Sequence, residues 1–276
     1  MSVLIDTDSL GRRLAAGERV VLLDVRWKLG DPHGHDHYLA GHLPGAAYAD
    51  LETELAGPPS ASAGRHPLPS VDVLQAAARR WGVRAGDTVV AYDDLGGLSA
   101  ARAWWLLRWA GLPEVWLLDG GLAAWTAAGG ALETGPVTPP AGDVVLRAGA
   151  LPTLSASSAA ALAASGVLLD ARAGERFRGE TEPVDPRAGH IPGAVSAPTA
   201  DNLDATGRFL PASELRARFA ALGADGSGPV GAYCGSGVTA AHELAALAVA
   251  GIDATLYPGS WSQWSADPDR PAATGP

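Results

Sequence analysis

The single cysteine of the chain, Cys234, heads a glycine-rich turn and is the residue best suited to nucleophilic chemistry. An apolar segment ends at Tyr233, the residues Cys-Gly-Ser-Gly-Val follow at 234–238, and an alanine-rich stretch continues to Ala250. Because glycine tolerates positive φ, such a turn can aim several backbone N–H groups at one point. A helix N-terminus behind it would favour a thiolate and an anion carried on its sulfur. The alternative is a buried structural cysteine.

The amides that follow the cysteine are the candidate donors to an anion on its sulfur. They belong to Gly235, Ser236, Gly237, Val238 and Thr239. Donors that are fixed before the charge develops stabilise it without reorganisation. We expect a strand over residues 229–233 and a helix over about 238–250 to hold this turn.

Composition limits the possible function classes. The chain has 276 residues, of which 47% are hydrophobic and 18% charged, and its formal net charge is −10. This length predicts one large or two modest domains, and the negative charge argues against nucleic acid as a partner. No apolar run approaches the roughly 18 residues of a membrane span, and no signal-peptide pattern opens the chain. One cysteine excludes an internal disulfide, so we expect a cytoplasmic and, from the Arg-, Ala- and Gly-rich composition, bacterial protein.

Four segments of the first half recur in the second half, in the same order and at nearly the same offset. Residues 20–26 recur at 166–172, residues 41–46 at 189–194, residues 90–93 at 231–234, and residues 118–125 at 257–264. Chance similarity would not preserve this order, so the chain is predicted to contain a duplicated domain. We set the two domains at residues 1–135 and 151–276, joined by a Pro-, Gly- and Thr-rich linker at 136–150.

Each half has the same predicted order of elements. An apolar run ending in Asp-x-Arg indicates a buried strand, and a Gly-His-x-Pro-Gly-Ala turn follows it. Further strands are expected at residues 88–92 and 115–118, and at 229–233 and 254–257, with helices at 71–81 and 213–222. Strands that alternate with helices predict an α/β fold, with a mostly parallel sheet flanked by helices in each domain.

These signatures resemble the rhodanese family of sulfurtransferases in its tandem two-domain form. The resemblance rests on residues 38–46, on the Gly-Ser-Trp-Ser-Gln-Trp at 259–264 and on the cysteine turn, and it covers nearly the whole chain. It implies two rhodanese-like domains, of which the C-terminal one is catalytic. Asp93 occupies the position of Cys234 in the N-terminal copy, and a carboxylate cannot carry a sulfane sulfur.

The resemblance implies a two-step sulfur transfer that needs no cofactor. Cys234 takes the outer sulfur of a small-molecule donor as a persulfide, and cyanide, a thiol or a thioredoxin-like protein removes it. The Cys-Gly-Ser-Gly-Val turn is similar to that of members that use 3-mercaptopyruvate, whereas thiosulfate users tend to carry two basic residues after the cysteine. We expect transfer from 3-mercaptopyruvate, with thiosulfate as donor or a sulfur-carrier role as the alternatives.

The mercaptopyruvate type pairs the serine of this turn with a histidine and an aspartate of the N-terminal half. His42 and Asp31 match these residues, so a Ser236–His42–Asp31 relay is expected to protonate the enolate that mercaptopyruvate leaves. In the alternative interpretation, His42 only hydrogen-bonds its own turn, as expected for His190.

Substrate contacts are implied by the same resemblance. Arg176 and Arg187 resemble the family's two carboxylate-binding arginines, with Arg178 competing with Arg187, and a guanidinium fork suits a carboxylate. The alternative for each is a solvated surface arginine. Trp27 matches an aromatic residue that lines the pocket in relatives, with ordinary core packing as its alternative.

Two other hypotheses are less favoured by the sequence. His33, His35 and His37 could bind zinc or nickel, but alternate positions in one loop do not build a closed site, so we expect no metal. The fold also hosts protein phosphatases, whose turn carries an arginine six residues after the cysteine. That position is Ala240 here, which argues against a phosphatase.

Overall fold

The computed structural model describes residues 3–276, and they group into two compact units. The first unit contains the described residues up to 57 together with 69–151 and 205–209, and the second contains 58–68, 152–204 and 210–276. The segment 58–68 therefore belongs to the unit of the cysteine although it comes from the first half of the sequence. The predicted linker 136–150 falls within the first unit, where the N–H of Gly142 donates to the carbonyl of Arg79.

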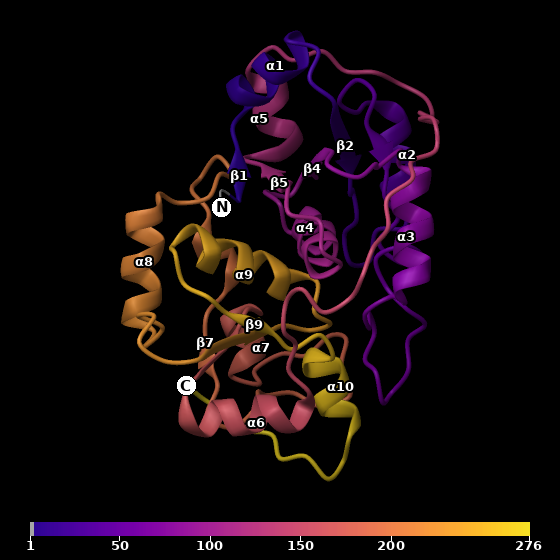
Figure 1. Ribbon diagram of the computed structural model, residues 1–276. Coiled ribbons are helices and arrows are strands. Elements are labelled where there is room, and N and C mark those ends of the chain that lie inside the picture. The colour runs from indigo at the N-terminus through magenta and orange to yellow at the C-terminus, as the bar shows by residue number, and fades with distance from the viewer. Residues whose placement is uncertain (1–2) are drawn as a thin grey trace. The chain divides into compact units, whose positions relative to one another are not determined.

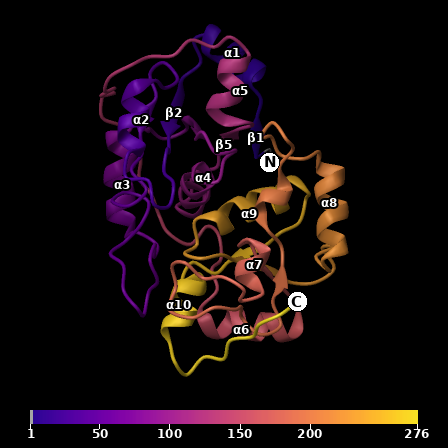
Figure 2. The ribbon, with the colours of Figure 1, turned by 180° about the vertical axis from the view of Figure 1, so that it is seen from behind.

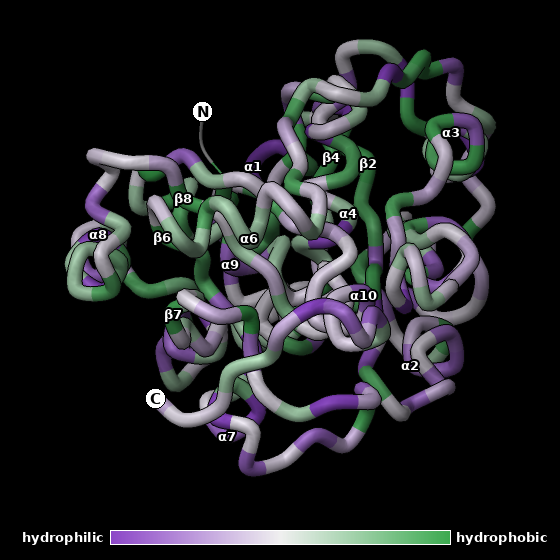
Figure 3. The backbone as a smooth tube through the Cα atoms, turned by 90° about the horizontal axis from the view of Figure 1, so that it is seen from below, coloured by the Kyte–Doolittle hydropathy of each residue, from purple (hydrophilic) through white to green (hydrophobic). Residues whose placement is uncertain are grey.

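Five parallel strands form the sheet of the first unit, in the order β1-β5-β4-β2-β3 (Figure 1). These strands are β1 (Leu4–Ile5), β2 (Val20–Asp24), β3 (Ala47–Tyr48), β4 (Thr88–Tyr92) and β5 (Val115–Leu118). The helices are α1 (Thr7–Ala15), α2 (Gly34–Ala40), α3 (Val71–Arg80), α4 (Ala100–Trp109) and α5 (Gly121–Ala127). The central strands β2 and β4 are continuous apolar runs, green in Figure 3, as expected for a parallel sheet covered on both faces.

The second unit repeats this arrangement with four parallel strands in the order β7-β6-β8-β9. Its elements are α6 (Ala156–Ser165), β6 (Val167–Asp170), α7 (Gly174–Phe177), β7 (Val195–Ser196), the 3-10 turn η1 (Thr199–Asn202), α8 (Ala212–Ala221), β8 (Val230–Tyr233), α9 (Thr239–Val249), β9 (Thr255–Leu256) and α10 (Ser260–Ala266). Helix α8 packs beside α9, as Figures 1 and 2 show from opposite sides. The order corresponds to β3-β2-β4-β5 of the first unit, which confirms the predicted duplication and the α/β fold class.

One strand of the first unit has no full counterpart in the second. Thr153 forms a single parallel bridge with Leu256, at the sheet edge where the first unit has β1. The predicted boundaries of the other elements agree with the structure to within one residue. Strand β9 is shorter than expected because Pro258, which has no N–H, ends the ladder after Tyr257. None of the helices in the part of the chain that the structure describes is long and apolar enough to cross a membrane.

The repeated Asp-x-Arg motif joins the end of a central strand to the following turn. The guanidinium of Arg26 binds both carboxylate oxygens of Asp24 and donates to the carbonyl of Gly41. Arg172 makes the equivalent contacts in the second unit. Both aspartates are fully buried, so each arginine satisfies a carboxylate that would otherwise be unpaired. These contacts place the Gly-His-x-Pro-Gly turns against their sheets.

Candidate active site

The cysteine turn joins β8 to α9 and surrounds the sulfur with backbone. Cys234 is 1% exposed, and the N–H of Gly237 donates to its Sγ at 3.1 Å. Gly237 has a φ of +79°, and a Cβ there would lie 2.5 Å from the carbonyl oxygen of Pro258, so only glycine fits. Val238 is buried at the N-cap of α9, and Thr239 is its first residue. The sulfur thus lies at the positive end of an 11-residue helix.

The Gly-Ser-Trp segment at the start of α10 also holds this turn. The N–H of Trp261 donates to the carbonyl of Cys234 at 2.9 Å, and the N–H of Ser262 donates to that of Gly235 at 2.8 Å. The Oγ of Ser260 accepts the N–H of Cys234 at 3.1 Å. Both carbonyls are thus bound by α10, and the N–H of Gly237 in the same turn donates to the sulfur. The C-terminal signature is therefore a support of the cysteine turn.

The corresponding turn of the first unit shows what such a backbone binds. Asp93 is fully buried between β4 and α4, and its carboxylate accepts four backbone N–H groups at 2.8–2.9 Å. The donors are Leu95, Gly97, Ser99 and Ala100. Burial raises the pKa of Asp93, and the four amides oppose that rise. An anion is thus built into this copy, at the position that the sulfur occupies in the second unit.

Ser236 has a histidine partner that the sequence did not indicate. Its Oγ lies 2.7 Å from Nδ1 of His66, and both residues are buried. His66 belongs to the segment 58–68, which is fastened to α10: the N–H of Arg65 donates to Oγ of Ser262 at 3.1 Å, and Nε2 of Gln263 donates to the carbonyl of Ser62. The same short helix therefore supports both the cysteine turn and this histidine.

His42 and Asp31, which were expected to form a relay with Ser236, both have partners within the first unit. Nδ1 of His42 lies 3.0 Å from the carbonyl oxygen of Leu43, and Nε2 lies 2.9 Å from that of Gly135, so both ring nitrogens already have backbone partners. The carboxylate of Asp31 instead accepts the N–H of His33 and pairs with His37. These contacts favour the alternative interpretation, in which His42 hydrogen-bonds its own turn. His190 likewise binds a backbone carbonyl in the second unit.

Two arginines approach the residue that follows the nucleophile. A Cβ built on Gly235 would lie 3.0 Å from Nη2 of Arg65 and 3.6 Å from Nη1 of Arg176. Arg176 also binds Glu182 at 2.6 Å and Asp185 at 3.2 Å. Arg176 is one of the two arginines expected from the sequence to bind a substrate carboxylate, whereas Arg65 was not expected.

Arg187 has a different surrounding from the one expected. Its guanidinium donates to four carbonyl oxygens at 2.7–3.0 Å, which belong to Trp264, Ser265, Asp267 and Arg270. These bonds fasten the C-terminal end of α10 and the residues after it, and they leave no fork for a substrate carboxylate. We therefore remove Arg187 from the proposed site. Arg178, its competitor, is bound to the exposed carboxylate of Glu180.

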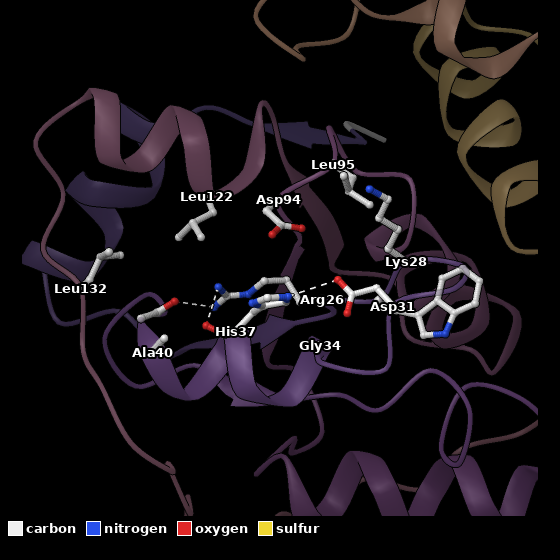
Figure 4. Close-up of a pocket in the computed structure, with 12 residues that line it drawn as sticks. Arg26, Lys28, Asp31, Gly34, His37, Ala40, Asp94, Leu95, Leu122 and Leu132 are labelled. Carbon is white, nitrogen blue, oxygen red and sulfur yellow. Dashed lines mark hydrogen bonds and ion pairs between the residues drawn. The ribbon is translucent and has the colours of Figure 1, made fainter.

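Trp27 and the three alternating histidines lie in the first unit, where His37 lines a pocket of about 490 Å³ (Figure 4). Trp27 lines this pocket, and its Nε1 donates to Glu52 at 2.7 Å. His33 and His37 pair with neighbouring carboxylates, whereas His35 stacks on Tyr38. Within residues 3–276 no group of three potential ligands is arranged to hold a metal ion.

A sequence signal for the missed residues does exist. The offset between the two halves is 148 at the Gly-His turn and 141 at the next strand, so the first half has seven additional residues between them. Arg65 and His66 lie in this stretch. Binding and catalytic residues are concentrated on loops, so an insertion present in one copy only is a place to look for them.

Comparisons with known proteins agree with this geometry. The family described as Rhodanese-like domain matches residues 6–128 and 155–267. The chain is 52% identical to a Mycobacterium tuberculosis protein provisionally named thiosulfate sulfurtransferase SseB, over 99% of this chain and 97% of that protein. It is 50% identical to a Pseudomonas aeruginosa protein provisionally named 3-mercaptopyruvate sulfurtransferase, over 99% and 98%. The crystal structure of SseA from Escherichia coli, described as a 3-mercaptopyruvate sulfotransferase, matches with a TM-score of 0.82 and 31% identity, over 95% and 99%.

Proposed function

This chain belongs to the rhodanese family, and from that premise we propose that it moves a sulfane sulfur from 3-mercaptopyruvate to a thiophilic acceptor through a persulfide on Cys234. One observation carries the proposal: the sulfur accepts the Gly237 N–H at the head of α9. This position can stabilise a negative charge on the sulfur before and after the outer sulfur is attached.

The first half-reaction breaks the carbon–sulfur bond of the donor. The Cys234 thiolate attacks the thiol sulfur of 3-mercaptopyruvate, a sulfur–sulfur bond forms, and the electron pair of the broken bond remains on the three-carbon fragment as the enolate of pyruvate. This enolate needs a proton. The hydroxyl of Ser236, two residues after the nucleophile, supplies it, and His66 at 2.7 Å returns a proton to the hydroxyl.

The second half-reaction restores the thiolate. Cyanide or a thiol attacks the outer sulfur, and the electron pair of the sulfur–sulfur bond returns to Sγ of Cys234. Cyanide yields thiocyanate and a thiol yields a new persulfide. We include a thioredoxin-like protein among the thiol acceptors. We also propose the cytoplasm as the compartment, because a chain with one cysteine cannot form an internal disulfide.

Thiosulfate is the second candidate donor, and one observation favours it. Its leaving group, sulfite, is an anion that needs charge compensation rather than a proton. The turn itself has no basic residue after Cys234, but Arg65 and Arg176 both approach Gly235. These guanidinium groups can compensate the charge of sulfite as well as that of a carboxylate.

The variants Ser236→Ala and His66→Gln distinguish transfer from 3-mercaptopyruvate from transfer from thiosulfate. With 3-mercaptopyruvate, each substitution should lower kcat about 100-fold, because the proton source is lost. With thiosulfate, each should change kcat less than about threefold, because sulfite leaves without a proton. Ser227→Ala, an exposed serine of the loop before β8, is the matched control and should change neither rate. Wild type should have the higher kcat/KM with 3-mercaptopyruvate. A preference for thiosulfate, with equal losses on both donors, would overturn the donor assignment.

A further inference from the structure

Two guanidinium groups approach the residue that follows the nucleophile. At Gly235, the position of a side chain lies 3.0 Å from Nη2 of Arg65 and 3.6 and 3.8 Å from Nη1 and Nη2 of Arg176. Gly235 is buried and directly follows Cys234. An anion bound by both guanidinium groups would therefore lie close to the reacting sulfur.

The two positive charges are held together by one buried carboxylate. Asp185 binds Nη1 of Arg65 through one oxygen and Nη2 of Arg176, at 3.2 Å, through the other, and its side chain is 2% exposed. Burial raises the pKa of Asp185, and the two arginines oppose that rise. Because Asp185 engages one end of each guanidinium, it fixes both groups while other N–H groups remain directed at Gly235.

Arg65 also has a donor without a partner among residues 3–276. Its Nε is buried and makes no hydrogen bond within the described part of the chain. An unpaired buried donor of a charged group is costly, and a bound anion would remove that cost. The backbone of Arg65 is fixed by its N–H bond to Ser262, so the side chain is delivered to the site by the same helix that supports the cysteine turn.

We propose that Arg65 and Arg176 form a guanidinium clamp that binds the carboxylate or sulfonate of an anionic sulfur donor beside Gly235, and that Arg65 is a specificity-determining residue of this protein. The identity of the donor rests on the proposed function, whereas anion binding at Gly235 does not. The clamp accepts a compact anion close to the transferred sulfur. It replaces the pair Arg176 and Arg187 expected from sequence, because Arg187 is bound to backbone carbonyls.

Alkylation of the single cysteine tests the clamp independently of sulfur transfer. Iodoacetate and iodoacetamide react alike: Sγ of Cys234 forms a bond to the methylene carbon, and iodide leaves. They differ in one respect, because iodoacetate carries a carboxylate next to the reacting carbon. In Arg65→Gln, the second-order rate with iodoacetate should fall about 10-fold or more, whereas the rate with iodoacetamide should stay within about twofold. Equal changes with both reagents, or no change with iodoacetate, would overturn the proposal.

Steady-state kinetics then connect the clamp to the donor. Arg65→Gln should raise KM for 3-mercaptopyruvate and for thiosulfate about 10- to 100-fold with a smaller change in kcat, and Arg65→Lys should lie between it and wild type. Arg12→Gln, an exposed arginine of α1, is the control for the loss of one charge and should match wild type. A fall in kcat with unchanged KM would assign Arg65 to loop positioning instead. A wild type that discriminates the alkylating reagents but transfers no sulfur would overturn the proposed function and leave the clamp intact.

Discussion

Replacement of Gly237 by alanine should disable the cysteine turn, and the structure sets the size of the effect. An L-residue at a φ of +79° costs roughly 1–2 kcal/mol. In addition, the new Cβ would lie 2.5 Å from the backbone oxygen of Pro258, so the turn or the chain before α10 must move. Together these effects should lower the free energy of unfolding by roughly 2–4 kcal/mol. The movement breaks or lengthens the 3.1 Å bond from the Gly237 N–H to Cys234, which should slow sulfur transfer about 100-fold.

A second glycine provides the matched control for this substitution. Gly226 also has a positive φ, +88°, but an added Cβ would meet nothing within 4 Å. Gly226→Ala should therefore show the conformational cost alone, with transfer at the wild-type rate. The assays are urea unfolding and the single-turnover rate of persulfide formation from 3-mercaptopyruvate. If Gly237→Ala were no less stable than Gly226→Ala and loaded sulfur as fast as wild type, the supporting role of the turn would be refuted.

Two further substitutions test buried charges outside the active site. Asp93→Asn should lower the free energy of unfolding by about 2–4 kcal/mol. Each carboxylate oxygen of Asp93 accepts two N–H groups, and the amide nitrogen that replaces one oxygen in asparagine can accept neither of its two. The kcat/KM for sulfur transfer should stay within about threefold of wild type. A large loss of transfer in the folded variant would contradict the inactive role of this copy. Burial raises the pKa of Glu243 on α9 to about 7, so its contribution to stability is present below about pH 4.5 and lost as the pH rises through 7. In Glu243→Gln, the free energy of unfolding measured in urea should therefore fall less between pH 5 and pH 8 than in wild type, by an amount on the order of 2–3 kcal/mol. An equal fall in both proteins would count against a raised pKa of Glu243.

The fold was predictable because its signals are local and occur twice. The apolar runs that became β2 and β6, and the turns after them, recur in the same order in both halves. Buried parallel strands must be continuous apolar runs, so these segments had one plausible structure. The cysteine turn was predictable for the same reason, since strand, glycines and helix are adjacent in the sequence.

The rest of the site depends on contacts between distant residues. His66 and Ser236 are separated by 170 residues, and no periodicity in segment 58–68 indicates where it packs. His42 belongs to a motif that also occurs as His190, and the carbonyl partners that favour a structural role for both are not revealed by spacing. Arg187 was misplaced for a related reason, because the backbone after α10 surrounds its guanidinium. Side-chain partners of this kind follow from tertiary packing and not from local sequence.

The most direct test of the central claim is the intact mass of the protein after incubation with 3-mercaptopyruvate. Wild type should gain the mass of one sulfur atom, and it should lose this mass when cyanide is added, with one equivalent of thiocyanate released. Cys234→Ser should keep its fold but gain nothing with either donor. A mass gain that persists in Cys234→Ser, or a wild type that turns over without carrying the additional sulfur, would contradict the persulfide on Cys234.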